Sequence, residues 1–90
     1  MRIIAGKYKG RRLNGPLWEG TRPTSDQLRE TLFNIISPRI NGARVLDGFS
    51  GTGALGIEAL SRGAEKITFI DDDLKAVRLI KKNLEVCGVL

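Results

Sequence analysis

Four residues in the middle of the chain have the types and spacing of a cofactor site. Asp47 ends a short apolar run, Gly51 and Gly53 lie in the glycine-rich loop that follows, and Asp71 ends the next apolar run. Glycines let the backbone approach a ligand closely, and a carboxylate accepts hydrogen bonds or attracts a cation. The order of strand, glycine loop, helix, strand and carboxylate is typical of a nucleotide-type site on a βαβ unit.

Two cofactors are compatible with this loop. Residues 51–56 match the dinucleotide pattern G-x-G-x-x-G, and Asp71 stands where that pattern places a ribose-binding acid. Asp47 disfavours a diphosphate, because two negative groups would repel each other, but it would attract the sulfonium and ammonium of S-adenosylmethionine. We therefore expect Asp47, Gly51, Gly53 and Asp71 to bind S-adenosylmethionine, with a nicotinamide dinucleotide as the alternative. A plain turn followed by a helix cap would use the same residue types.

Apolar periodicity predicts the elements that position these residues. Short apolar runs at 44–47 and 66–70 predict two buried strands, and helical spacing predicts helices at about 52–62 and from Asp72 or Asp73 to Gly88. Together they predict a parallel βαβ unit of an α/β fold. The expected inward positions on the two helices are Leu55, Ile57, Ala59 and Leu60, then Val77, Ile80, Leu84 and Cys87.

Another helix is expected before the first strand. Thr24 and Gln27 form a capping box after Pro23, and the pair Ser37-Pro38 would end the helix. The apolar residues between them recur at helical spacing. They predict a buried face made of Leu28, Leu32, Phe33, Ile35 and Ile36.

Positive charge is concentrated in the first half of the chain. Residues 1–44 contain nine of the fifteen Lys and Arg residues and three acidic residues, whereas residues 45–90 contain six basic and seven acidic residues. Residues 2–13 predict a short hairpin that turns between Gly6 and Gly10. Its tip and second strand carry Lys7, Lys9, Arg11 and Arg12. Such a segment favours a polyanion such as nucleic acid, with a solvated basic surface as the alternative.

The number of cysteines and the length of the apolar runs limit the class of protein to which the chain can belong. Cys87 is the single cysteine and there is no histidine, so we expect neither an internal disulfide nor a metal site. No apolar run approaches the roughly 20 residues needed to span a bilayer, and residues 1–7 lack the apolar region of a secretory signal. We expect a cytoplasmic protein without a membrane partner.

The stretch VLDGFSGTGALGIEALSRGA, residues 45–64, resembles the cofactor-binding segment of RsmD-type methyltransferases. These bacterial enzymes modify a guanine N2 of small-subunit (16S) ribosomal RNA. The resemblance extends to RIIAGKYKGRRL at the N-terminus, to RPTSDQLRETLFNII, and to ITFIDDD together with Asn83. It therefore covers nearly all ninety residues in the right order.

The resemblance implies a fold and a set of contacts. The fold is the Rossmann-like class I S-adenosylmethionine-dependent methyltransferase fold, here its first two βα units. Residues 1–22 would form an RNA-contacting hairpin and linker, and residues 23–90 the N-terminal part of the methyltransferase domain. The residues implied to contact ribosomal RNA, or the small subunit, are Lys7, Lys9, Arg11, Arg12, Arg22 and Thr24. Arg29 and Glu30 would fix their helix to the domain, and Tyr8 and Trp18 would either stack on an unpaired base or pack against the hairpin.

One feature of such enzymes is missing from the sequence. They act through an (Asp/Asn)-Pro-Pro-(Tyr/Phe) loop, whereas the three prolines here, Pro16, Pro23 and Pro38, all precede the glycine loop. We therefore expect the catalytic residues to lie outside these ninety residues and the chain alone to turn over little substrate. We also expect self-association or marginal stability, because strand edges would be open. The alternatives are a non-catalytic RNA- or cofactor-binding module and a nicotinamide-dependent enzyme.

Overall fold

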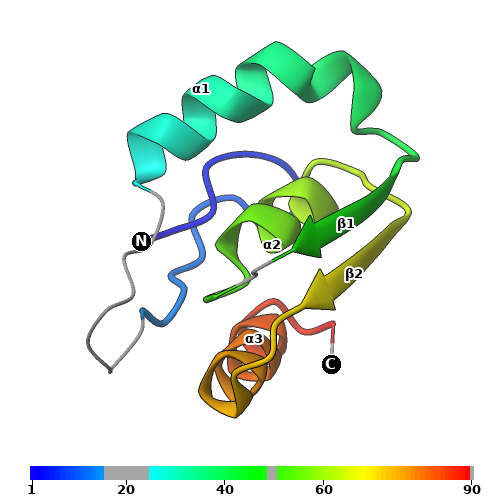
Figure 1. Ribbon diagram of the computed structural model, residues 1–90. Helices are drawn as coiled ribbons and strands as arrows, with labels where there is room; N and C mark the ends of the chain where they lie inside the picture. Colours follow the sequence, from blue (N-terminus) through cyan, green and yellow to red (C-terminus); the bar gives the residue numbers. More distant parts are fainter. Residues whose placement is uncertain (16–24, 49–50, 90) are drawn as a thin grey trace.

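The computed structural model describes residues 1–15, 25–48 and 51–89 (Figure 1). The elements in chain order are α1 (Asp26–Ile36), a short 3-10 turn η1 (Ser37–Arg39), β1 (Arg44–Gly48), α2 (Ala54–Ser61), β2 (Lys66–Ile70) and α3 (Leu74–Val86). The expected βαβ unit and the helix on each side of it are confirmed. The bounds of β2 are those expected, and β1 continues one residue further to Gly48.

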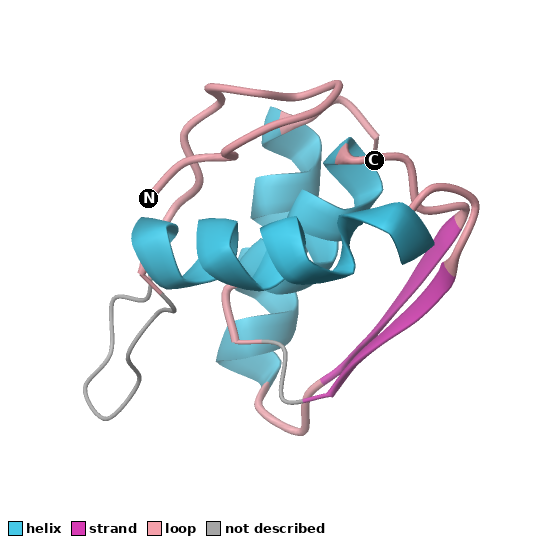
Figure 2. Ribbon diagram, turned by 90° about the horizontal axis from the view of Figure 1, so that it is seen from above, coloured by secondary structure: helices cyan, strands magenta, loops and turns pink. Residues whose placement is uncertain are grey.

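The two strands form a parallel sheet with one covered face. Arg44 pairs with Lys66 and Gly48 with Ile70, so the carboxyl ends of both strands lie at the same edge. Viewed from above, all three helices lie on one side of the strands (Figure 2). Side chains on the opposite face are open to solvent: Leu46 is 67% exposed and Ile70 is 52% exposed.

Helix α2 packs directly on the covered face of the sheet. A Cβ atom at Gly56 would lie 2.4 Å from the ring of Phe69 and 2.8 Å from the side chain of Ile67, both on β2. Only glycine permits this approach, because real Cβ atoms are not found so close to other heavy atoms. The close contact sets how near the start of α2 lies to the carboxyl ends of the strands.

The N-terminal segment forms the expected hairpin with less strand structure than predicted. Arg2 and Arg12 make an isolated antiparallel bridge, and the Ile3 N–H donates to the Arg11 carbonyl at 2.9 Å. Three residues of the hairpin enter the core between α2 and α3. The buried residues of this cluster are Ile3, Tyr8, Leu13, Ala54, Ile57 and Cys87.

The buried face of α1 differs from the prediction. Arg29 and Phe33 are buried, whereas three residues of the predicted face, Leu28, Leu32 and Ile35, are exposed. The helix is rotated because Arg29 is drawn into a buried ionic contact with Glu58 on α2. Phe33 then packs with Ile40, Ala59 and Ala64, which makes a second core cluster.

On α3 the buried residues are Ala76, Leu79, Ile80 and Asn83. The expected burial of Ile80 and Cys87 is confirmed, whereas the expected Val77 and Leu84 are only half-buried.

The helix starts and the inner face of α2 also differ from the prediction. Ser25 rather than Thr24 caps α1, since its side-chain oxygen accepts from the Leu28 N–H at 3.1 Å; Thr24 lies outside the described residues. Helix α2 begins at Ala54, after Gly53, and not at residue 52. Its buried positions include two polar side chains, Glu58 and Ser61, whereas the expected Leu55 and Leu60 are half-buried.

Candidate functional site

The glycine loop is held against the end of β2 by Asp71. The Gly51 N–H donates to Asp71 Oδ2 at 3.0 Å, and the Asp73 N–H donates to the other carboxylate oxygen at 2.9 Å. Gly51 has φ +57° and Gly53, the N-cap of α2, has φ +80°, a region that glycine adopts without a steric cost. The predicted loop and the predicted carboxylate are therefore brought together.

Asp47 lies at the neighbouring strand end, with its side chain under the first turn of α2. It is 8% exposed, and its Oδ2 accepts a hydrogen bond from the Gly56 N–H at 3.1 Å. This bond satisfies one of the free N–H groups at the start of a helix. Asp47 therefore joins the end of β1 to the helix that carries the glycine loop.

The two carboxylates differ in their acidity. Burial raises the pKa of Asp47, with a smaller increase from the negative charge of Asp71, and the Gly56 hydrogen bond partly opposes both. The backbone hydrogen bonds from Asp73 and Gly51 lower the pKa of Asp71. A cation placed near Asp47 would favour its ionised form, because an opposite charge lowers the pKa of a carboxyl group.

A buried side chain on α3 fixes the middle of the glycine loop. The Asn83 side chain is fully buried, and its Nδ2 donates to the Thr52 carbonyl at 2.8 Å and to the Asn14 carbonyl at 3.1 Å. Asn83 Oδ1 accepts from the Asn14 N–H at 2.7 Å. One amide thus joins the loop, α3 and the end of the hairpin.

Each carboxylate borders its own pocket. Asp71 lines a pocket of about 240 Å³ between β2 and α3, together with Phe69, Ile80 and Lys81. Asp47 lines a pocket of about 160 Å³ between α1, β1 and α2, whose walls are mostly apolar. The polar groups of the site and the apolar walls beside them are the usual components of a small-molecule site.

The residues at this edge fit S-adenosylmethionine better than a dinucleotide. The carboxylate of Asp47 lies under the first turn of α2, where a diphosphate would have to approach, and residues 45–56 contain no lysine or arginine that could offset this repulsion. Asp47 and Asp71 instead supply negative charge and hydrogen-bond acceptors, which suit an ammonium, a sulfonium and ribose hydroxyls. The raised pKa of Asp47 fits this assignment too, because a bound cation would offset the cost of ionising a buried carboxyl group.

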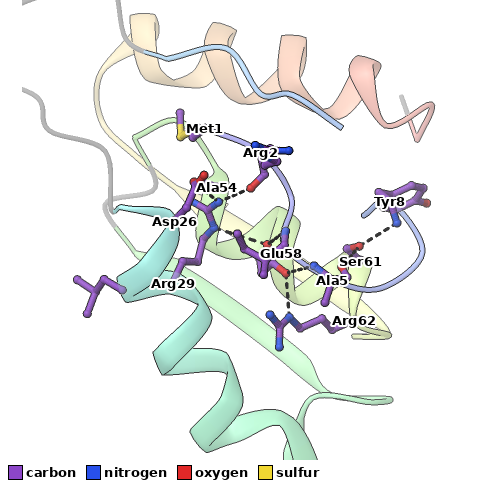
Figure 3. A network of polar contacts seen from close by, with 12 residues as sticks. Met1, Arg2, Ala5, Tyr8, Asp26, Arg29, Ala54, Glu58, Ser61 and Arg62 are labelled. Carbon is purple, nitrogen blue, oxygen red and sulfur yellow. Dashed lines mark hydrogen bonds and ion pairs between the residues drawn. The ribbon is translucent and has the colours of Figure 1, made fainter. Parts of the chain in front are cut away.

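Glu58 on α2 anchors the N-terminal hairpin (Figure 3). Its carboxylate is fully buried and accepts from the N–H groups of Ile4 at 2.9 Å and Ala5 at 3.1 Å. Arg62 donates to the same carboxylate at 2.8 Å, and Arg29 Nε lies 3.5 Å from its Oε1. Two cations and two backbone donors therefore compensate one buried charge.

Two further contacts hold the hairpin in place. Ser61 Oγ accepts from the Tyr8 N–H at 2.9 Å and donates to the Ala5 carbonyl at 2.7 Å. Arg29 donates to the Arg2 carbonyl and to Asp26 Oδ1, the latter at 2.8 Å. The implied role of Arg29 in fixing α1 to the domain is consistent with these contacts, whereas Glu30 is exposed.

The basic side chains of the hairpin lie on its outer surface. Lys7, Lys9, Arg11 and Arg12 are all exposed. Arg11 stacks on the Tyr8 ring at 5.1 Å from its centroid and donates to the Val86 carbonyl of α3 at 3.1 Å. Tyr8 is 8% exposed, so it packs against the hairpin. The other residues implied to contact RNA, Arg22, Thr24 and Trp18, lie outside the described residues.

Sequence reasoning did not identify Glu58 and Ser61 as polar contacts, and named Asn83 only within the resemblance. A signal was present, since each lies among apolar residues on the inner side of its helix. Within residues 1–15, 25–48 and 51–89, no group of three or more His, Cys, Asp or Glu side chains is arranged to hold a metal ion. In the same ranges, none of the helices is both long enough and apolar enough for a transmembrane span.

Comparison with known proteins gives a consistent set of relatives. Residues 1–90 match the protein family described as "Conserved hypothetical protein 95". The Ribosomal RNA small subunit methyltransferase D of Haemophilus influenzae is 51% identical over 85 residues, which cover 94% of this chain and 44% of that protein. The protein of the same name from Escherichia coli is 50% identical over 84 residues, covering 93% of this chain and 42% of its own length.

Two solved structures share the arrangement of the elements. The yhhF protein of Escherichia coli has a TM-score of 0.85 at 48% identity, over 98% of this chain and 48% of its own. A hypothetical protein of Thermus thermophilus has a TM-score of 0.84 at 39% identity, over 98% of this chain and 50% of its own. The chain thus spans half or less of the length of these four proteins.

Proposed function

Because the chain belongs to the RsmD-type family of methyltransferases, we propose that it is the cofactor- and RNA-binding part of an enzyme that methylates a guanine N2 of 16S ribosomal RNA. The methyl donor is S-adenosylmethionine. The observation that carries this proposal is the pairing of Gly51 with Asp71 beside the buried carboxylate of Asp47. This arrangement supplies the acceptors that a cationic nucleoside needs and places a carboxylate where a diphosphate would have to bind.

Each residue of the site has a defined task in the proposal. Asp71 accepts the ribose hydroxyls, and Gly51 and Gly53 let the loop backbone lie against the cofactor. Asp47 faces the positively charged methionine end. S-adenosylmethionine, when bound, supplies an electrophilic methyl group on its sulfonium. These residues position that group, and orientation alone contributes much to such a transfer.

The exposed basic residues of the hairpin hold the RNA. Lys7, Lys9, Arg11 and Arg12 contact phosphates, which gives position rather than sequence recognition. Arg22 and Thr24 complete this set. Glu58 and Ser61 support the proposal because they fix the hairpin to α2, the helix that begins at the cofactor loop. The acceptors for the guanine amine hydrogens lie on the Pro-Pro loop, outside these residues, so the chain alone turns over little substrate.

Cofactor binding is tested by calorimetry. We expect S-adenosylmethionine to bind the ninety-residue chain saturably and Asp71→Asn to weaken binding about tenfold or more, since hydrogen bonds to a charged group contribute roughly 1.5–3 kcal/mol. Asp72→Asn is the matched control, because it removes the same charge from an exposed neighbour. Equal loss in both variants, or tighter binding of NADH than of S-adenosylhomocysteine, would contradict the proposed cofactor.

The RNA substrate is tested in cells. Deletion of the gene should leave one guanine of 16S ribosomal RNA without its N2 methyl group, and the gene should restore that group. Mass spectrometry of nucleosides from purified 16S and 23S RNA identifies both the base and the subunit. An unchanged N2-methylguanosine content in 16S RNA would exclude this substrate and leave the non-catalytic binding module as the better description.

A further inference from the structure

A row of positive side chains follows one flank of α3. Lys75, Arg78 and Lys82 are spaced three and four residues apart, so they lie one above another on the helix surface. All three are exposed, and none forms an ion pair with another residue in the described ranges. At 1.5 Å per residue, the row is about 10 Å long.

The row continues into the hairpin. Lys82 and Val86 are four residues apart on α3, and the Val86 carbonyl accepts a hydrogen bond from Arg11. Arg11 lies over the Tyr8 ring, and Lys7 Nζ lies 5.6 Å from the centroid of the same ring. Arg11 therefore lies at the C-terminal end of the row on α3, where one acidic residue, Glu85, stands between Lys82 and Val86.

The row of cations on α3 extends from the basic hairpin toward the proposed cofactor site. Its far end, Lys75, is the second residue of α3, and α3 begins three residues after Asp71. Asn83 and Asn14 hold the hairpin against the same helix, so the row on α3 and the hairpin are fixed relative to each other. Lys81 does not belong to this row, because it lies on another side of α3 and lines the pocket beside Phe69 on β2.

We propose that Lys75, Arg78 and Lys82 form a phosphate-binding track, which carries an RNA backbone from the hairpin along α3 toward the cofactor edge. This rests on the proposed function and extends it, because it assigns RNA contacts to a helix outside the hairpin. The occupant is a sugar-phosphate backbone, since exposed cations in a row along one helix flank match the repeating charge of phosphates, whose contacts give position rather than sequence.

The experiment compares two variants with the same change in charge. Arg78→Ala/Lys82→Ala removes two cations from the track, and Arg39→Ala/Lys66→Ala removes an exposed arginine and an exposed lysine from positions outside it. Binding of a labelled RNA oligonucleotide of mixed sequence is measured by fluorescence anisotropy over a range of KCl concentrations. Circular dichroism establishes that each variant is folded, and these exposed side chains should tolerate truncation.

We expect the track variant to bind on the order of tenfold more weakly than the control variant, and its slope of log K against log[salt] to fall by about 1.4–1.8. Equal affinities and slopes for the two variants would overturn the track. Lys7→Ala/Lys9→Ala separates this failure from that of the proposed function. If the hairpin variant weakens binding and the track variant does not, only the track is wrong; if the hairpin variant also binds like wild type, the RNA contacts of the proposed function are wrong as well.

Discussion

The side chain of Asn83 on α3 and the carbonyl of Thr52 in the glycine loop are joined by a 2.8 Å hydrogen bond, although 31 residues separate them in the sequence. Asn83 is fully buried and bonds at the same time to Asn14 at the end of the hairpin. A buried amide with all its partners supplied specifies one arrangement of the segments around it. The loop thus takes its position from α3 as well as from the strands.

Replacement of Asn83 should loosen the glycine loop. Asn83→Asp keeps an acceptor for the Asn14 N–H but places an oxygen against the Thr52 carbonyl, and a buried group left unsatisfied costs about 1–3 kcal/mol. We expect this loss in urea unfolding, together with faster hydrogen exchange of the Gly51 amide. Asn34→Asp, on the exposed side of α1, is the control. Unchanged exchange at Gly51 would show that Asn83 does not hold the loop.

The Glu58 carboxylate is the corresponding junction between the hairpin, α1 and α2. Glu58→Ala would leave Arg29 buried without that partner and two backbone donors, Ile4 and Ala5, without an acceptor. Breaking a buried ion pair costs about 3–5 kcal/mol, which approaches the whole stability of a small domain. We expect the variant to be largely unfolded by circular dichroism.

Two comparisons make this prediction specific. Glu58→Gln keeps one acceptor oxygen and the side-chain volume, so it should lose less stability than Glu58→Ala. Glu65→Ala should cost less than about 1 kcal/mol, because the Glu65 pair with Arg44 is exposed and 4.0 Å long. Glu58→Ala and Glu58→Gln variants that are both as stable as wild type would mean that the buried charge contributes little.

The backbone of the site could be predicted because its signals are local. Apolar runs bounded by glycine and aspartate defined β1 and β2, and the carboxylates at their ends followed from the parallel order. Asp73 as the cap of α3 was one of two candidates, and its side chain accepts from the Lys75 N–H at 2.9 Å. These features depend on neighbours only a few residues away.

The contacts that orient the site could not be predicted because they are not local. Glu58 reaches Ile4 across 54 positions and Asn83 reaches Asn14 across 69. Their positions on the apolar sides of their helices indicate burial, but nothing in the sequence says which distant segment each one contacts. The predicted buried face of α1 was wrong for a related reason. Apolar spacing at Leu28 and Leu32 indicated burial, but the position of Arg29 was decided by a charge on another helix.

The open face of the sheet should make the chain self-associate. Leu46 and Ile70 expose large apolar side chains on adjacent strands, and unpaired strand edges offer hydrogen-bonding groups to another chain. We expect a concentration-dependent increase in mass by sedimentation, reduced in Leu46→Ser/Ile70→Ser. Leu74→Ser removes an equally exposed side chain from α3 and should change nothing. A monomer at all concentrations would refute the prediction.

Asp71 should stabilise the fold only when it is ionised. The backbone hydrogen bonds from Asp73 and Gly51 lower its pKa from the usual 3.8. The folded state therefore releases this proton more readily than the unfolded chain does, and the stabilisation is present above pH 3.8 and lost as the pH falls through the lowered value. The thermal unfolding midpoint of wild type should exceed that of Asp71→Asn at neutral pH and approach it in acid. A difference that is constant with pH would exclude the charge as its source.

Asp47 should have the opposite effect on stability. Burial raises its pKa above the usual 3.8, so the folded state resists ionisation and loses stability as the pH rises through the raised value. Asp47→Asn keeps an acceptor for the Gly56 N–H without this cost. We therefore expect the variant to be more stable than wild type at neutral pH and equally stable below pH 3.8.

The same substitution should weaken cofactor binding, because the amide does not attract the sulfonium and ammonium. A loss of about tenfold is expected, from roughly 1.5 kcal/mol for one charged contact. Wild-type affinity should also fall in acid, as Asp47 takes up a proton, while the affinity of Asp47→Asn should change less. Calorimetry and thermal unfolding on the same samples test both effects. A variant that is less stable yet binds S-adenosylmethionine normally would show that Asp47 is a structural cap of α2 and not a ligand for the cofactor.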